Sequence, residues 1–424
     1  MLNNNFYFDL VIIFSTLLSL QGILSLYQLL YGLLHPENMQ KNTIATLQVV
    51  AKTTFSIIIP CRHEEKVIGD TLKNILSMDY SERLVEILVS IGSDDTATIE
   101  AVKKVIALHP KRQLRIVLFD PSIAPRKSFN LNAALKLAQN EYIAVFDAED
   151  EVHTRLLSYV NTLIQEEGNS IIQTGVSLRN WKSNWYSLHA VMEYYFWFHS
   201  RLHWYASQGI VPLGGVGIFI PTQVVMAMNG WDEDCLTEDA KLGFEAARRG
   251  YTFRVLSNED IATREEVPTT LGSFVRQRTR WIQGFLQIAF SGQWSNLSVV
   301  KQLLFFTLFI FPVLQMLFYV WFGISWMYSS KLPIPIVLFS YLPLALLLFQ
   351  FAVQLSGVVE MLMLRQEKMS IPFALLVYIV TYPFYQFILV FAALRALYRN
   401  LVGSTNWEKT QHFNMHRGGI TVSI

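Results

Sequence analysis

The sequence predicts an α/β domain, with a mostly parallel sheet flanked by helices, between transmembrane helices at both ends. Hydrophobic residues make up 52% of the 424 residues and charged residues only 16%, which is too apolar for an ordinary soluble protein. Four stretches lack Asp, Glu, Lys and Arg, and each exceeds the roughly 20 residues that cross a bilayer. Between them, short apolar runs alternate with helical patterns, as in a parallel sheet with covered faces.

The membrane part is expected to consist of an amino-terminal anchor at residues 1–34 and about three apolar segments within residues 299–398. A connector spans residues 35–54, and a tail spans residues 399–424. Lys41 and Lys52 follow the first apolar stretch, whereas residues 1–9 carry no Lys or Arg. Because positive residues favour the cytoplasmic side, we expect a multi-pass protein of the plasma or inner membrane with a cytoplasmic domain. The charge-free stretches are Leu10–Leu34, Gln302–Ser330, Leu332–Val359 and Met369–Leu394.

The last apolar stretch conflicts with that orientation. Three simple crossings after the domain would place Arg395 and Arg399 outside, against the positive-inside rule. Pro383 lies in the middle of this stretch. We therefore expect the segment to be broken or re-entrant there, which returns the tail to the cytoplasm and lets 406–410 reach the globular domain.

The globular domain is expected at residues 55–268. Apolar, β-rich runs at 55–60, 85–91, 114–119 and 142–146 predict strands, and helical spacing follows near 131–137. In sheets of this kind, ligands bind beyond the carboxyl ends of the strands. The two cysteines, Cys61 and Cys235, give no disulfide framework, which suits a reducing cytosol. The net charge of +1 gives no reason to expect nucleic acid.

An acidic cluster, Asp147-Ala148-Glu149-Asp150, directly follows the fourth predicted strand. Two carboxylates at a strand end could hold Mg²⁺ or Mn²⁺, which accept oxygen ligands and leave positions open for phosphates. The alternative is a solvated acidic turn. Lys127, just upstream, could pair with a diphosphate as a point charge, or it could be an exposed lysine at a helix start capped by Ser128.

Two further motifs carry candidate chemistry. Asp239, in Thr237-Glu238-Asp239, is a reasonable base for a hydroxyl group. An amphipathic helix at the interface, within residues 269–298, carries Gln277-Arg278-Thr279-Arg280-Trp281, and its spacing lets Gln277, Arg280 and Trp281 project to one side. An arginine fork can bind a diphosphate and an indole can pack on a sugar. The alternative is a surface helix anchored at lipid headgroups.

The ordered set of motifs resembles the membrane-bound family 2 glycosyltransferases, which include cellulose, hyaluronan and poly-N-acetylglucosamine synthases. The resemblance covers about residues 55–287. It rests on a strand ending in Pro60, then Lys127, Asn130 and Asn132, the acidic cluster, Gly214-Gly215, Thr237-Glu238-Asp239 and Gln277–Trp281.

The resemblance implies a GT-A-type sheet and an inverting, metal-dependent transfer of a sugar from a nucleotide-diphosphate donor, usually linked to UDP. It implies Mg²⁺ or Mn²⁺ as cofactor. It assigns catalysis to Asp239 with Glu238, and the metal to Asp147 and Glu149, with Asp150 possible. The residues implied to bind the diphosphate are Lys127, Gln277, Arg278, Arg280 and Asp147. Those implied to bind the nucleoside are Pro60, Arg62, Glu64, Asp94 and Asp95, and those implied to bind the acceptor are Trp281, Gly214 and Gly215.

The chain departs from the family pattern at two places. An Asp pair usually follows the second strand, whereas here Gly92-Ser93 does, and Asp94-Asp95 is displaced. Glu149 stands where Asp is usual, so either Glu149 or Asp150 completes the metal site.

The sequence is compatible with three functions. The first is extension of a growing polysaccharide at the membrane, with accessory export subunits or an oligomer as possible partners. The second is a single transfer to a lipid-linked acceptor. The third is a non-catalytic scaffold derived from such enzymes. The aromatic residues between 185 and 205 form either a belt at the bilayer surface or a contact for acceptor or lipid.

Overall fold

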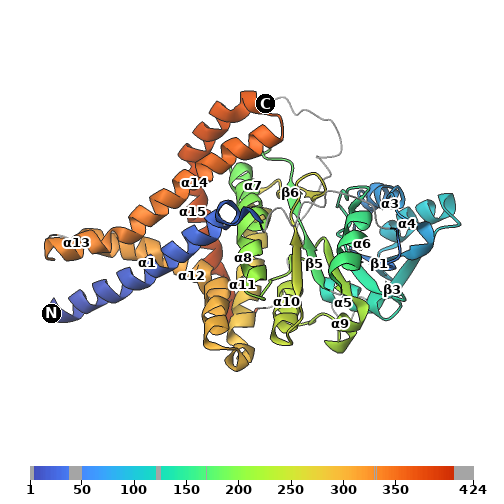
Figure 1. Cartoon of the computed structure of the whole chain (residues 1–424), viewed down its shortest axis with the longest axis horizontal. Helices are drawn as coiled ribbons and strands as arrows, with labels where there is room; N and C mark the ends of the chain where they lie inside the picture. The colour runs from blue at the N-terminus through green and yellow to red at the C-terminus, as the bar shows by residue number, and fades with distance from the viewer. Residues whose placement is uncertain are drawn as a thin grey trace.

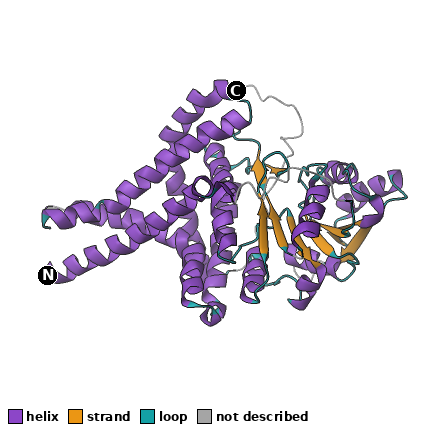
Figure 2. Ribbon diagram, in the orientation of Figure 1, coloured by secondary structure: helices purple, strands orange, loops and turns teal. Residues whose placement is uncertain are grey.

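The computed structural model describes residues 4–37, 50–120, 126–168, 170–328, 330 and 332–404. Part of the predicted connector and the segment 406–410 lie outside these residues. The strands gather at one end of the molecule, and long helices extend from the other (Figures 1 and 2). The predicted α/β architecture, with apolar helices on both sides of the domain in sequence, is confirmed.

A seven-stranded sheet with the order β3-β2-β1-β4-β7-β5-β8 forms the centre of the domain. All four predicted strands are present and pair in parallel: β1 (Phe55–Cys61), β2 (Val85–Gly92), β3 (Leu114–Phe119) and β4 (Tyr142–Val145). Only β7 (Ile218–Pro221) runs antiparallel, between β4 and β5 (Ile171–Thr174), which pairs in parallel with β8 (Phe253–Leu256). A small second sheet joins β6 (Val176–Leu178) to β9 (Thr263–Glu265).

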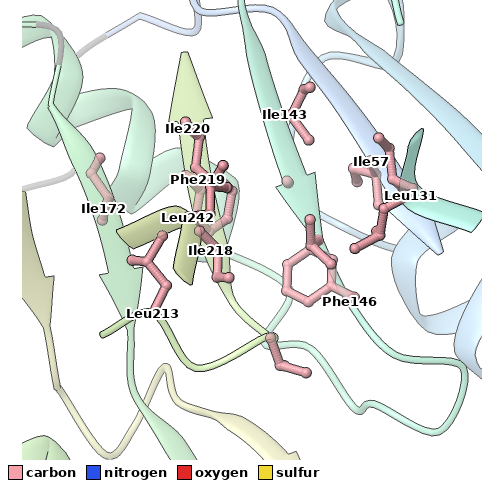
Figure 3. Close-up of a cluster of buried hydrophobic side chains, with 14 of the residues drawn as sticks. Ile57, Leu131, Ile143, Phe146, Ile172, Leu213, Ile218, Phe219, Ile220 and Leu242 are labelled. Atoms are coloured by element: carbon pink, nitrogen blue, oxygen red, sulfur yellow. The ribbon is translucent and has the colours of Figure 1, made fainter. Parts of the chain in front are cut away.

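Helices cover both faces of the sheet, so its central strands are buried on both sides. Their side chains meet those of the helices in one core, part of which is shown in Figure 3, where Phe146 and Phe219 lie between Ile57 and Ile172. The covering helices are α3 (Ile68–Leu76), α4 (Thr96–Leu108), α5 (Lys127–Leu135), α6 (Leu156–Glu167), α9 (Thr222–Ala227) and α10 (Glu238–Arg248), with a 3₁₀ turn η1 (Glu82–Leu84).

The aromatic segment forms α7 (Ser187–Phe196), a π-helical turn η2 (Trp197–Arg201) and α8 (Leu202–Ser207). Tyr195, Phe198, Trp204 and Tyr205 are buried. These side chains therefore pack inside the protein, and they do not form a belt against lipid.

The predicted amphipathic helix is α11 (Leu271–Phe290). Four helical segments are long and apolar enough to cross a bilayer: Phe8–Leu34, Val299–Met327, Ile334–Leu364 and Lys368–Leu401. They correspond to α1 (Asn4–Leu34), α12 (Val299–Tyr328), α13 (Ile334–Ser340) with α14 (Leu342–Leu364), and α15 (Ile371–Leu401), with the 3₁₀ turns η3 (Gln293–Asn296) and η5 (Lys368–Ser370) between elements.

The expected break at Pro383 is wrong, because α15 continues through this residue as one helix. A proline inside a helix removes one N–H donor, and packing against neighbouring helices can stabilise the remaining turns. Such packing is present here, since Tyr385, two residues later, is buried against Phe274 of α11, with ring centroids 5.9 Å apart.

The segment before α15 contacts the globular domain, and the segment after it contacts α11. Just before α15, Arg365 lies 3.2 Å from Glu259 in an ion pair. Just after it, the carbonyl of Ser404 accepts a hydrogen bond of 2.6 Å from Gln283 of α11. The helix therefore runs alongside α11, at the boundary between the sheet and the extended helices (Figure 1).

Candidate active site

A cavity of about 560 Å³ begins at the carboxyl ends of β1 and β4 and continues between the apolar helices. Its wall at the sheet includes Pro60, Lys127 and Asp147. Its wall at the helices includes Gln315 of α12 and Gln350 of α14. The sheet edge, where ligands bind in folds of this kind, thus opens into the helical part of the molecule.

Lys127 lies at the centre of the polar end. Its Nζ is 2.5 Å from Oδ1 of Asp147 and donates a hydrogen bond of 3.0 Å to the carbonyl of Gly215. Burial alone would lower the pKa of Lys127, but the carboxylates of Asp147 and Glu238 outweigh it and raise that pKa. Lys127 is therefore a fixed positive charge facing the cavity, and not the exposed helix-start lysine of the alternative interpretation.

Glu238 and Asp239 occupy the first turn of α10 and line the same cavity. Burial, together with the neighbouring Asp239, raises the pKa of Glu238 to about 7. Burial likewise raises the pKa of Asp239, opposed by the charges of Lys127 and Arg280. A carboxyl group whose pKa approaches neutrality is suited to accept a proton from a hydroxyl group.

Asp239 and Gly215 approach each other closely across the cavity. Gly215 has a φ of +76°, and a Cβ atom added to it would lie 2.6 Å from Oδ2 of Asp239. Only glycine adopts this backbone conformation without strain and leaves room for the carboxylate. The Gly214-Gly215 motif therefore shapes the wall next to the candidate base.

The acidic cluster divides into side chains with different surroundings. Asp147 and Glu149 line the cavity. Asp150 is fully buried, and its Oδ2 accepts a hydrogen bond of 2.7 Å from the backbone N–H of Asp147, which closes the turn. Glu265, at the end of β9, also lines the cavity, and burial together with Asp147 and Glu149 raises its pKa to about 8.

These oxygen donors fit a hard divalent cation. Among the described residues, no group of three or more His, Cys, Asp or Glu side chains could hold a metal ion by itself. Mg²⁺ is commonly bound by one or two carboxylates together with substrate phosphates. Asp147 and Glu149 match that incomplete set, and Asp150 is occupied by the turn.

The helix α11 brings its motif against Thr237-Glu238-Asp239. Gln277, Arg280 and Trp281 all line the cavity, as their spacing predicts. Gly284 makes this approach possible, because a Cβ atom there would lie 2.8 Å from the backbone nitrogen of Thr237.

Arg278 takes a different position from that of Arg280. It is 9% exposed, and its guanidinium lies 2.8 Å from Glu193 of α7 in an ion pair. It also lies 4.6 Å from the ring centroid of Trp281. Arg278 also lines the cavity, and these contacts hold its guanidinium against Glu193 and the indole of Trp281. Its contact with the diphosphate stays a prediction.

The cavity wall includes Pro60, Arg62 and Glu64, three of the residues predicted to bind the nucleoside. Arg62 forms an ion pair with Asp94, with a second bond of 2.8 Å from Nη2 to Oδ2. Asp95 is 2% exposed and caps α4 through Thr98. Of the two displaced acids, Asp94 is the accessible one at the rim, and Asp95 is structural.

Sequence reasoning missed Glu193, Glu265 and Arg201, all of which line the cavity. The only local signal was for Glu265, which ends β9, whereas Asp147 lies two residues beyond the end of β4. Glu193 and Arg201 lie in the aromatic segment, where the many aromatic residues gave no indication of charged side chains in a binding site.

A family model and several related proteins point to the same family for this chain. Residues 52–284 match the family model described as glycosyltransferase-like family 2. A beta-monoglucosyldiacylglycerol synthase of Nostoc sp. is 29% identical over 64% of this chain and 56% of its own length. The probable glycosyltransferase YdaM of Bacillus subtilis is 23% identical over 86% of this chain and 88% of its own length.

The chain thus spans little more than half the length of the first of these relatives. A poly-beta-1,6-N-acetyl-D-glucosamine synthase of Staphylococcus aureus is 25% identical over 65% of this chain and 62% of its own length. Among solved structures, a mannosyltransferase of Pyrobaculum calidifontis in complex with GDP-Man and Mn²⁺ is 18% identical, with a TM-score of 0.51, over 91% of this chain and 99% of that one. That likeness shows a shared fold.

Proposed function

Because the chain belongs to the family 2 glycosyltransferases, we propose that it transfers a sugar from a nucleotide-diphosphate donor to a hydroxyl group of a membrane-held acceptor. One observation carries this proposal. Lys127 stands between Asp147 and Gly215, and the candidate base Asp239 lies beside Gly215. A fixed cation for a diphosphate thus lies next to a carboxylate that can accept a proton.

The proposed reaction is a single displacement. The carboxylate of Asp239 takes the proton of the acceptor hydroxyl, whose oxygen forms a bond to the anomeric carbon of the donor sugar. The bond from that carbon to the diphosphate breaks, the nucleoside diphosphate leaves with the electron pair, and the configuration inverts. Lys127 and Arg280 hold the diphosphate, and Trp281 positions the acceptor sugar.

Asp147 and Glu149 would hold Mg²⁺ or Mn²⁺, which when bound supplies positive charge opposite the diphosphate oxygens. Gln277 supports the same end of the donor from α11. Pro60, Arg62 and Glu64 form the wall next to the nucleoside, with Asp94 at its rim.

The purified full chain in detergent, given UDP-sugars or GDP-sugars with Mn²⁺, is expected to release nucleoside diphosphate. Asp239→Asn keeps the shape of the side chain but removes the base, so the rate should fall at least ~100-fold. Asp79→Asn is the matched control, because this side chain is exposed and lies outside the cavity wall. Release at the wild-type rate by the Asp239→Asn variant would contradict the proposed base.

The side chains that line the cavity are compatible with two classes of acceptor. A growing polysaccharide fits the amide and aromatic side chains of its wall, among them Gln315, Gln350 and Tyr382. A lipid-linked acceptor fits the far end of the same cavity, where Leu18, Phe318 and Leu347 lie. Product length on a gel separates the two, because a polymer gives a ladder and a single transfer gives one product.

The proposal also includes a membrane arrangement with three crossings. Exposed apolar side chains recur every three or four residues along α15, as in a helix with one lipid-facing stripe. The segment before this helix contacts the globular domain through Arg365, and the segment after it contacts α11 through Ser404. We therefore place α1, α12 and α14 across the bilayer and α15 along its cytoplasmic surface. The stripe consists of Phe373, Leu376, Val380, Phe384, Phe387, Phe391, Leu394 and Tyr398.

This arrangement puts Arg395 and Arg399 on the same side as the catalytic domain, as the positive-inside rule requires. Spin labels on cysteines placed at Leu376, Phe387 and Tyr398 test it, since the native Cys61 and Cys235 are buried. A surface helix gives three similar depths in the bilayer. A crossing helix would separate the first and last labels by about 33 Å of depth, at ~1.5 Å per residue.

A further inference from the structure

Arg201 is a positively charged side chain in the cavity wall at the level of the apolar helices. It is the last residue of the π-helical turn that follows α7. A π turn inserts an extra residue into a helix and is often found at functional sites.

The guanidinium of Arg201 has few polar contacts. Its Nη2 donates a hydrogen bond of 3.2 Å to Oγ of Ser25 in α1. Its Cζ lies 5.9 Å from the ring centroid of Phe311 in α12. Within the described part of the chain, no carboxylate oxygen lies within 4.0 Å of it, and nearby Glu193 is already paired with Arg278.

A charge placed away from water without a counter-charge is costly. Burial lowers the pKa of Arg201, the direction expected when the charged form is disfavoured. An anionic ligand in the cavity would supply the missing negative charge. The guanidinium fork matches the oxygen atoms of a phosphate group in particular.

The position of Arg201 relative to Trp281 restricts the ligand further. Tyr194 lies beside Trp281, with ring centroids 6.3 Å apart. Arg201 follows Tyr194 by seven residues along the same helical segment, so it lies about two turns farther along that segment. A phosphate at Arg201 is thus farther from Trp281 than the length of a single sugar ring.

Beyond Arg201 the wall of the cavity becomes apolar. Leu18 precedes Ser25 by seven residues in α1, and Phe318 follows Phe311 by seven residues in α12. Both residues lie roughly 10 Å farther from the catalytic domain, and both line the cavity. They belong to an apolar cluster between α1 and α12 that also includes Trp321.

We propose that Arg201 binds the phosphate of a lipid-linked sugar acceptor, whose sugar lies at Trp281 and whose hydrocarbon tail follows the apolar end of the cavity. This inference rests on the proposed function and narrows its acceptor. The order of polar, charged and apolar surfaces along the cavity matches the order of sugar, phosphate and tail in such a molecule.

Equilibrium binding of radiolabelled hexadecyl phosphate to the purified full chain in an uncharged detergent tests the site. Arg201→Gln should weaken binding about tenfold or more, as expected for loss of a charge-assisted contact. Ser25→Asp places a carboxylate beside Arg201 and should weaken binding similarly while the arginine remains. Arg83→Gln is the control, because Arg83 is exposed and lies outside the cavity wall.

Binding of UDP or GDP, measured on the same samples, should be unchanged in both cavity variants and shows that they are folded. Wild-type affinity for hexadecyl phosphate in both variants would overturn the assignment. Equal displacement of the probe by hexadecanol or by inorganic phosphate would also overturn it, since the first lacks the anion and the second lacks the tail. Binding that depends on Arg201 in a chain that cleaves no sugar donor would leave this site standing and refute the proposed function alone.

Discussion

Replacement of Gly215 by alanine tests how closely the catalytic wall fits the candidate base. The added Cβ atom would lie 2.6 Å from Oδ2 of Asp239, whereas ordinary contact begins at 3.4 Å. The carboxylate must therefore move by about 3.4 − 2.6 = 0.8 Å. A misplacement of ~1 Å at a reacting group lowers the rate ~100-fold. We expect kcat for nucleoside diphosphate release to fall about 100-fold.

The same substitution also strains the backbone, because a residue with a side chain at positive φ costs ~1–2 kcal/mol. Gly250→Ala separates the two effects. Gly250 has a φ of +83°, and nothing lies within 4 Å of its added Cβ. Both variants should lose similar stability in thermal unfolding, but Gly250→Ala should keep its activity. Equal activity losses in the two variants, or full activity in Gly215→Ala, would refute the reasoning.

Two further predictions concern the charges of the site. Glu193→Gln removes the charge that holds Arg278 against Trp281, so KM for the acceptor should rise several-fold while KM for the donor stays constant; equal rises in both would contradict this role. A raised pKa means that protonation begins at higher pH, so kcat should fall as the pH decreases through about 7, the pKa of Glu238 beside the base. Lys127→Met removes a charge that lowers the pKa of both Glu238 and Asp239, so at saturating donor the acid limb should move to higher pH, and an unmoved limb would show that these carboxyls do not control it.

The features that the sequence predicted correctly depend on local periodicity. Four apolar runs became the parallel strands β1 to β4, because a strand buried on both faces needs such a run. The helix α11 lies within the predicted range 269–298, and Gln277, Arg280 and Trp281 line one cavity, because residues three and four apart share a helix face.

The features that the sequence did not predict depend on contacts between distant segments. Arg278 and Arg280 both belong to the set predicted to bind the diphosphate. The sequence did not show that Arg278 forms an ion pair with Glu193 of α7. Charge counting likewise detected a conflict at the last apolar stretch, but it could not reveal that Arg365, before α15, contacts the globular domain and that Ser404, after it, contacts α11.

The packing of α15 on α11 has a consequence for the order of biosynthesis. Ile282 and Leu286 of α11 are buried against Ala392, Ala393 and Ala396 of α15. The ribosome makes α11 before α12 and α14, so these two side chains lack their contacts with α15 until more than a hundred further residues have been added. Nascent chains that stop before α15 therefore have a complete sheet but a Trp281 helix without its α15 contacts, and sugar transfer should begin only after the last helix has docked.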